Sequence, residues 1–220
     1  MGSNIKKRII TSIFLISLLI LMFFYAFIMI ISVIIISIIA WIEFYALISK
    51  IFKKDKTKHK ILRFFCKTTS LFYLSALVYL IFIIESDHSD LKIYFLYSVL
   101  VAIMSDIGGL FFGKIFKGKK LTKISPNKTI SGSIGSLIFS MLLILFSYEN
   151  IFNKDLISLF AITISISIIS QLGDLFVSLL KRKAKVKDTS DILPGHGGIL
   201  DRIDGIIFAI PVGIFLFITI

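Results

Sequence analysis

The chain has 220 residues, of which 57% are hydrophobic and only 17% are charged, and its mean hydropathy is +0.97. Soluble domains average roughly 45–50% apolar and about 25% charged residues, so this composition predicts membrane spans of about 20 residues each and excludes a disordered or collagen-like chain. The net charge of +12 is compatible with nucleic acid, anionic lipid or an anionic substrate, and the single Cys66 excludes an intramolecular disulfide framework.

Seven apolar segments follow one another along the chain. The first apolar run follows Lys6, Lys7 and Arg8 and extends to Ile48, which predicts two tightly connected helices hinged near Tyr25. Polar segments separate the later spans: a basic segment interpreted as a solvated loop, a short acidic loop, a lysine-rich stretch, a polar turn and a Gly-rich segment. The predicted spans cover residues 9–24, 26–48, 68–84, 91–113, 130–147, 156–180 and 205–220, and the polar segments cover 49–67, 85–90, 114–128, 148–155 and 181–204.

The charges are distributed unevenly over these loops. With a cytoplasmic N-terminus, 23 of the 25 Lys and Arg residues lie on the cytoplasmic side, and only Lys92 and Lys154 lie on the other. This asymmetry predicts an all-α polytopic membrane protein with about seven transmembrane helices and its N-terminus inside. It also explains most of the net charge as a topology signal and as attraction to anionic headgroups, and it disfavours nucleic-acid binding.

A polar stripe runs along the end of the predicted sixth span. Gln171, Asp174, Ser178 and Lys181 have offsets of 0, 3, 7 and 10, so they share one face of a helix that is otherwise apolar. Asp174 lies inside the membrane boundary, where an unpaired carboxylate costs several kcal/mol. The stripe therefore indicates either a functional ligand or an ion pair that packs helices together.

A second cluster follows in residues 187–204. Pro194, Gly195, Gly197 and Gly198 prevent a continuous helix and leave backbone N–H groups free to approach an anion. Asp201 and Asp204 fall one helical turn apart, at a spacing that suits a hard cation such as Mg²⁺ or, alternatively, capping of the helix N-terminus. Arg202 and Lys187 could bind phosphate oxygens. His196 could either donate a hydrogen bond to a ligand or cap the turn.

The segment 105–136 also combines glycines, bases and hydroxyls. Residues 113–119 imitate the start of a phosphate-binding P-loop, but Lys120 replaces the hydroxyl residue and no strand precedes it, so we reject that motif. The stretch still offers lysines and amides to a polyphosphate. Asp106 is a further acid near a membrane boundary, either a ligand or a charge at a helix end.

Residues 178–204 resemble the signature of the phosphatidate cytidylyltransferases, also called CDP-diacylglycerol synthases. The matching positions include Ser178, Lys181-Arg182, Lys187-Asp188 and the run from Leu193 to Asp204. The resemblance continues upstream, although Ser131-Gly132 stands where the family usually has Glu-Gly. Its upstream motifs are Trp41-Ile42-Glu43-Phe44, the Ser-Asp-x-Gly-Gly stretch at 105–109, Gly-Lys-Lys-Leu at 118–121 and Ser-Pro-Asn-Lys-Thr at 125–129.

The resemblance implies that CTP and phosphatidate react to give CDP-diacylglycerol and pyrophosphate, with charge neutralisation and positioning in place of a protein nucleophile. It implies Asp174, Lys181 and Asp201 as catalytic residues, and Asp174 and Asp201 as ligands of Mg²⁺, with a second cation left open. The implied substrate-binding residues are Asp106, Lys119, Lys120, Ser125, Lys128, Ser178, Arg182, Lys187, Asp188, His196, Gly197, Gly198, Arg202 and Asp204.

The same resemblance implies an active site at the cytoplasmic face of the cell's inner membrane and a homodimer as the family precedent. Residues 1–67 would form N-terminal spans with a basic loop, and residues 68–220 a catalytic region with the signature at 178–204. Two alternatives remain. A CTP-using lipid kinase would transfer the γ-phosphate to a lipid alcohol, and a cation-coupled transporter is disfavoured because the acids cluster at one face instead of spreading through the membrane depth.

Overall fold

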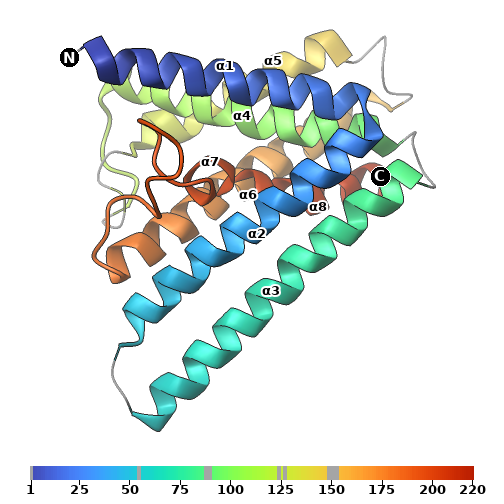
Figure 1. Cartoon of the computed structure of the whole chain (residues 1–220). Coiled ribbons are helices and arrows are strands. Elements are labelled where there is room, and N and C mark those ends of the chain that lie inside the picture. Colours follow the sequence, from blue (N-terminus) through green and yellow to red (C-terminus); the bar gives the residue numbers. More distant parts are fainter. Residues whose placement is uncertain (1, 54–55, 87–90, 123–124, 126–127, 148–153) are drawn as a thin grey trace. The chain divides into compact units, whose positions relative to one another are not determined.

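The structure is a computed structural model of the chain, and it describes residues 2–53, 56–86, 91–122, 125, 128–147 and 154–220. The described residues are mostly helical and form no strand beyond two isolated bridges, Lys120 with Thr129 and Leu193 with Gly197. The predicted all-α fold is therefore confirmed. The helices are α1 (Gly2–Phe24), α2 (Ala26–Ile51), α3 (Thr57–Ser86), α4 (Lys92–Phe116), α5 (Ile130–Ser147), α6 (Leu156–Lys183), α7 (Leu200–Ile203) and α8 (Ile206–Thr219) (Figure 1).

Six candidate spans in the described chain are long and apolar enough to cross a membrane, and α5 is a shorter apolar helix. Large apolar side chains remain exposed on them, as at Phe27, Phe72 and Ile157. Such exposure is expected where lipid, not water, surrounds the helix. The chain is thus a multi-pass membrane protein, and the fifth of the seven predicted spans is the one that falls short.

The helix boundaries differ from the predicted ones at two places. Helix α3 begins at Thr57, inside the segment predicted to be a solvated loop, because Lys, Arg and Leu are good helix formers and no Gly or Pro interrupts them. The short helix α7 forms inside the segment 181–204 that was predicted to be polar and Gly-rich, whereas α8 agrees with the last predicted span at 205–220. The predicted hinge at Tyr25 is observed, since that residue has an extended backbone with φ −123° and ψ 108°.

The chain forms two compact units. The first comprises Met1–Ser89 and Leu180–Ile203. In it α2 packs against both α1 and α3, and the short α7 contacts α2. Residues from the end of the chain thus return to the N-terminal helices. These units are defined by contacts within the chain. The predicted division between residues 67 and 68 is instead functional, separating N-terminal spans from a catalytic region; it falls inside α3 and stays a prediction.

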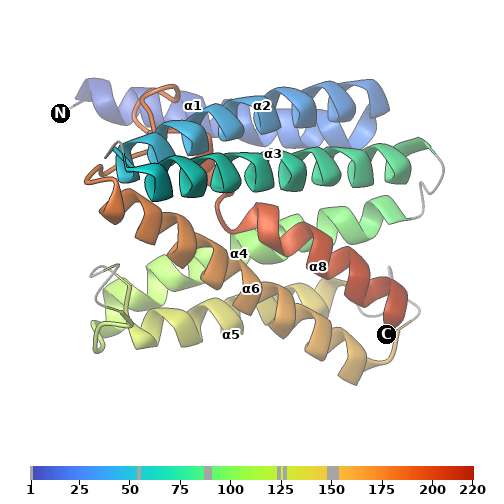
Figure 2. The ribbon, with the colours of Figure 1, turned by 90° about the horizontal axis from the view of Figure 1, so that it is seen from below.

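The second unit comprises Asp90–Leu179 and Asp204–Ile220. Helix α4 packs against α5 and α8, and α4 and α5 run side by side (Figure 2). The two backbones approach closely at Gly108, where an added Cβ would lie 2.5 Å from the carbonyl oxygen of Gly135. The core beside this pair contains a hydrogen bond between the Tyr97 hydroxyl and Thr163 Oγ1 of 2.7 Å and apolar side chains such as Phe217.

Candidate active site

Residues 184–199, which we call the signature loop, join α6 to α7 in the first unit. A tight turn closes inside the loop, with hydrogen bonds from the Leu193 N–H to the Gly197 carbonyl (2.8 Å) and from the Gly197 N–H back to the Leu193 carbonyl (3.2 Å). Gly195 and Gly197 have φ values of 79° and 84°, a region that residues with a Cβ rarely adopt. The predicted interruption of the helix is therefore confirmed.

Asp201 receives donors on both carboxylate oxygens. Lys181 Nζ lies 2.6 Å from Oδ1, and the side chains of the pair are only 14% and 4% exposed. Oδ2 accepts hydrogen bonds from the Thr189 N–H (2.8 Å) and the Gly198 N–H (3.1 Å), and it lies 3.0 Å from the Thr189 hydroxyl oxygen, whose single proton it shares with Glu43. Three predicted site residues, Lys181, Gly198 and Asp201, thus meet in one nearly buried network, whose carboxylate needs such partners to remain charged.

The glycines of the loop leave room for this network. A Cβ at Gly197 would lie 3.1 Å from Asp201 Oδ2 and 3.2 Å from Asp188 Cβ. A Cβ at Gly198 would collide with the Thr189 hydroxyl. Side chains at these two positions would push the loop away from Asp201, so the predicted roles of both glycines have a steric basis.

Glu43 of α2 is the site residue that the sequence reasoning missed. Its side chain is 2% exposed. Oε1 accepts hydrogen bonds from the Ser190 hydroxyl (2.5 Å) and the Ile199 N–H (3.1 Å), and Oε2 accepts from the Thr189 hydroxyl (2.7 Å) and the Leu200 N–H (2.8 Å). One carboxylate thus holds both ends of the signature loop. The signal was its position, because an acid inside an apolar span indicates a specific partner.

Helix α1 holds the turn of the loop. Arg8 Nε donates to the Gly195 carbonyl at 3.0 Å, and the Thr11 hydroxyl donates to the Pro194 carbonyl at 3.0 Å. The sequence pattern indicates Arg8 only as one of the basic residues that set the membrane topology, and this contact was not predicted. The loop that carries the signature is therefore fixed by α1 and by α2, more than 140 residues away in sequence.

Arg202 and His196, two predicted substrate ligands, contact each other. The guanidinium of Arg202 donates to the His196 carbonyl from Nη2 (2.6 Å) and Nε (3.1 Å). Burial and the positive charges of Arg202 and Arg8 lower the pKa of His196, against a smaller opposing effect of the Pro194 carbonyl. His196 is therefore suited to act as a neutral imidazole at pH 7. Arg182, Lys187, Asp188 and Arg202 are exposed.

Asp174 forms a second network, which lies in the second unit. It makes an ion pair with Lys128, which lies two residues before the start of α5. The Ser178 hydroxyl donates to Asp174 Oδ1 at 3.3 Å, and Gln171, one turn earlier, accepts a hydrogen bond from the Ser133 hydroxyl at 2.6 Å. The predicted stripe thus has polar partners, and the structure brings together Lys128, Asp174 and Ser178, three of the residues that the resemblance implies.

The remaining predicted residues of the second unit have different surroundings. Lys119 and Lys120 have exposed side chains, and their backbone is fixed by pairing with Thr129 and Ile130. The Ser125 N–H donates to the Thr122 hydroxyl at 3.3 Å. Asp106 is exposed on α4, whereas Asp204 is buried and accepts a hydrogen bond from the Gly205 N–H at 2.9 Å. Asp204 and Asp201 belong to different units.

The donor chemistry of both networks fits a hard cation, because carboxylate oxygens are the ligands that Mg²⁺ prefers. The described residues contain no group of three or more His, Cys, Asp or Glu side chains that could hold a metal. Instead Asp174 faces Lys128 and Asp201 faces Lys181. A cation at either carboxylate would take the position that a lysine ammonium now occupies.

Comparison with known proteins identifies the family to which the chain belongs. A family model described as the cytidylyltransferase family matches residues 3–220. The phosphatidate cytidylyltransferase of Staphylococcus haemolyticus (strain JCSC1435) is 46% identical over 128 residues, which are 57% of this chain and 49% of that protein. That of Bacillus subtilis (strain 168) is 42% identical over 125 residues, 56% of this chain and 46% of that protein. The chain thus spans about half the length of these curated relatives.

Proposed function

We propose, from the premise that the chain belongs to the cytidylyltransferase family, that it makes CDP-diacylglycerol and pyrophosphate from CTP and phosphatidate. The curated relatives that it matches carry the name phosphatidate cytidylyltransferase. The observation that supports the proposal best is the network at the two ends of the signature loop, in which Lys181, Gly198 and Asp201 meet beside the end of an apolar helix. Such a site suits one polyanion dissolved in water and another held in lipid.

In the proposed reaction a phosphate oxygen of phosphatidate attacks the α-phosphorus of CTP. The new phosphorus–oxygen bond joins the two phosphates, the bond to the β-phosphate oxygen breaks, and pyrophosphate leaves with its electron pair. The protein needs to supply alignment and positive charge, because transfers of this kind depend on positioning and electrostatic stabilisation.

Positive side chains supply that charge. Lys128 and Lys181 each neutralise a carboxylate in the structure, and we propose that they turn toward phosphate oxygens when substrates bind. The exposed Arg182, Lys187 and Arg202 would hold further phosphate oxygens. The proposed hydrogen-bond donors and remaining ligands are Ser125, Ser178, His196, Gly197, Gly198, Lys119, Lys120, Asp106, Asp188 and Asp204, and the N–H groups of Gly197 and Gly198 would have to leave the Leu193 carbonyl and Asp201 to reach a substrate.

We further propose Mg²⁺ as the cofactor, with Asp174 and Asp201 as its ligands and a second cation left open. When bound, Mg²⁺ would neutralise charge on the polyphosphate and on departing pyrophosphate. Each aspartate would exchange its lysine for the cation, which would also release that lysine for substrate. The proposed location of the site is the cytoplasmic face of the membrane, and the proposed assembly is a homodimer.

The experiment uses the purified chain with phosphatidate, Mg²⁺ and CTP that is labelled either in the cytidine or at the γ-phosphate. The proposal predicts cytidine label in the lipid product and γ-label in released pyrophosphate. Transfer of the γ-label to lipid would instead identify a lipid kinase. Absence of label from the lipid in both reactions, with protein verified as folded, would contradict both activities.

A further inference from the structure

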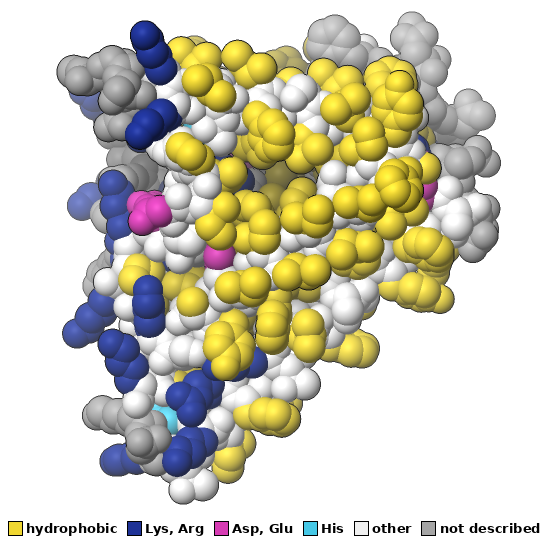
Figure 3. All heavy atoms as spheres, in the orientation of Figure 1, with side chains coloured by type: hydrophobic (Ala, Val, Ile, Leu, Met, Phe, Trp, Pro, Cys, Tyr) yellow, Lys and Arg dark blue, Asp and Glu magenta, His cyan; other side chains and the backbone are white. Residues whose placement is uncertain are grey.

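A groove of about 380 Å³ opens between α2 and α3, entirely within the first unit. It combines three cationic side chains with aromatic and aliphatic ones, and none of the described residues that line it is acidic. Figure 3 shows Lys and Arg side chains gathered at the basic end of α2 and α3, whereas hydrophobic side chains cover the rest of these two helices. The lining residues are Trp41, Tyr45, Lys60, Arg63, Phe64, Lys67, Thr68 and Leu71.

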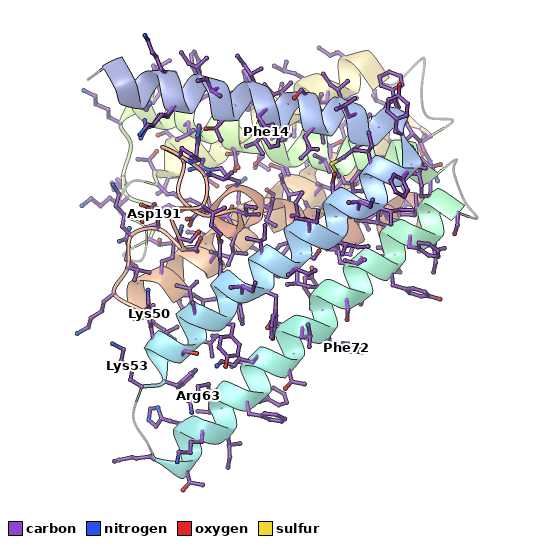
Figure 4. The ribbon with its side chains drawn as sticks, viewed as in Figure 1. Phe14, Lys50, Lys53, Arg63, Phe72 and Asp191 are labelled. Carbon is purple, nitrogen blue, oxygen red and sulfur yellow. The ribbon has the colours of Figure 1, made fainter. Side chains whose placement is uncertain are left out.

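Contacts between the two helices fix one side of the groove. The Trp41 indole N–H donates to the Lys67 carbonyl at 3.3 Å. Lys67 Nζ lies 3.1 Å from the centroid of the Tyr45 ring, a cation–π contact. Arg63 lies on the side of α3 toward α2, opposite Phe72 (Figure 4), and it forms no hydrogen bond or ion pair with another described residue. Its guanidinium therefore has donors to offer a ligand.

The length of α3 places the groove at headgroup depth. The helix has 30 residues, about 45 Å at a rise of about 1.5 Å per residue, whereas the hydrocarbon core is about 30 Å thick. Residues 68–84 contain no charge, and all the basic residues of α3 lie in 57–67. The uncharged part fits the hydrocarbon core, so Lys60, Arg63 and Lys67 reach the layer of lipid phosphates.

The groove is separate from the signature loop. Trp41 and Tyr45 are four residues apart and share a face of α2, whereas Glu43 lies two residues from each and points to the opposite face. Glu43 holds the signature loop on its own face. The groove thus has no residue in common with the proposed reaction.

We propose that this groove binds the headgroup phosphate of an anionic phospholipid. Lys60 and Arg63 contact the phosphate, Lys67 stays on the Tyr45 ring, and the acyl chains extend along Phe64 and Leu71. The apolar lining favours a lipid over a free anion, because inorganic phosphate has nothing to bury there. Amphipathic Trp and Tyr side chains at this depth are typical of membrane interfaces.

The test uses Trp41, the only tryptophan of the chain, as a probe inside the groove. Full-length protein in detergent micelles is titrated with phosphatidylglycerol or phosphatidylcholine whose acyl chains are brominated, and quenching of Trp41 fluorescence is followed. Phosphatidylglycerol is expected to quench at about fivefold lower mole fraction, since one basic residue near a lipid surface contributes about 1 kcal/mol. The comparison in the wild-type protein requires no variant to fold.

A pair of double variants separates the groove from general surface charge. K60Q/R63Q should abolish the preference for phosphatidylglycerol, whereas K50Q/K53Q, which removes two exposed charges beside the groove, should retain it. Three results would overturn the proposal: equal loss in both double variants, no quenching by either lipid because protein covers Trp41, or displacement of the lipid by inorganic pyrophosphate. The readout is binding, so it is independent of the proposed enzymatic activity.

Discussion

Glu43 is a single carboxylate on which three hydrogen bonds from the signature loop and one from the first residue of α7 converge. Since its carboxylate is buried and occupied by these contacts, we interpret it as a positioning residue that keeps Thr189 beside Asp201. Its importance follows from burial, because a donor left without an acceptor in a dry interior costs about 1–3 kcal/mol.

Replacing Glu43 with Gln should therefore disorder the loop without changing its volume. The NH₂ group of the Gln side chain is a hydrogen-bond donor, and it would face two loop groups that donate to the carboxylate in the wild type. We therefore expect the free energy of unfolding to fall by about 1–3 kcal/mol and the apparent KM for CTP to rise. Thermal unfolding and steady-state kinetics in detergent measure the two effects. D191N, a change at an exposed loop residue, is the matched control and should resemble the wild type. Equal behaviour of E43Q and D191N would show that the loop does not depend on Glu43.

His196 gives a prediction about pH. Burial and the charges of Arg202 and Arg8 disfavour the imidazolium, so the pKa of His196 should lie below the usual value of about 6.5. The stability linked to this group is then fully present above about pH 6.5 and is lost as the pH falls through the folded-state pKa. NMR titration of the His196 imidazole, assigned with H196Q, should give a midpoint under about 6.5. A midpoint above that value would contradict the surroundings described.

At the residue scale, the sequence predicted those site residues that lie close to one another along the chain. Lys181, Gly197, Gly198 and Asp201 belong to one local pattern, so their spacing and the family resemblance could single them out together. The contacts of Glu43, Arg8 and Thr11 join segments more than 140 residues apart. No local periodicity encodes such pairs, so their partners required the fold.

Helices α4 and α5 show what decides the packing of elements. An added Cβ at Gly135 would collide with the ring of Phe112, and one at Gly108 would meet the Gly135 carbonyl. Small residues therefore let the two backbones approach, as in many membrane helix pairs, where close packing replaces the hydrophobic effect.

Substituting Gly135 with Ala should force these helices apart. We expect a loss of about 1–3 kcal/mol, the usual cost of overpacking, measured as lower thermal stability in detergent. I134A removes side-chain volume at the adjacent exposed position and should have a smaller effect. If G135A is as stable as I134A, the close approach of α4 and α5 is not required.

The elements themselves were largely predictable, because apolar runs interrupted by charge mark membrane helices clearly. The errors arose where two signals conflict. Residues 57–67 are too polar for a span yet have high helix propensity, and they continue α3. Leu200–Ile203 belongs to a polar, Gly-rich segment yet forms the short helix α7, which begins two residues after Gly198.

The whole molecule is a multi-pass membrane protein in which the signature segment belongs to the same compact unit as the N-terminal helices. Sequence predicted the number of apolar segments well but not this association, which depends on long-range contacts. The side of the membrane on which the loops lie remains a prediction from the 23 of 25 basic residues assigned to one side.

Orientation can be measured in intact cells. In a C66S background, K154C should react with a membrane-impermeant maleimide, whereas K119C should react only after the membrane is permeabilised. Both variants are tested for expression and folding first. The reverse labelling pattern would place the N-terminus outside.

The most direct test of the account compares wild-type protein with D201N, both verified as folded, in an assay of phosphatidate-dependent pyrophosphate release from CTP in the presence of Mg²⁺. The wild type should release one pyrophosphate per CDP-diacylglycerol. D201N should lose at least about a hundredfold in rate, because the substitution removes the charge that Lys181 and the proposed Mg²⁺ share. Turnover of D201N near the wild-type rate across Mg²⁺ concentrations would contradict the account and leave Asp201 as a structural ion-pair partner of Lys181.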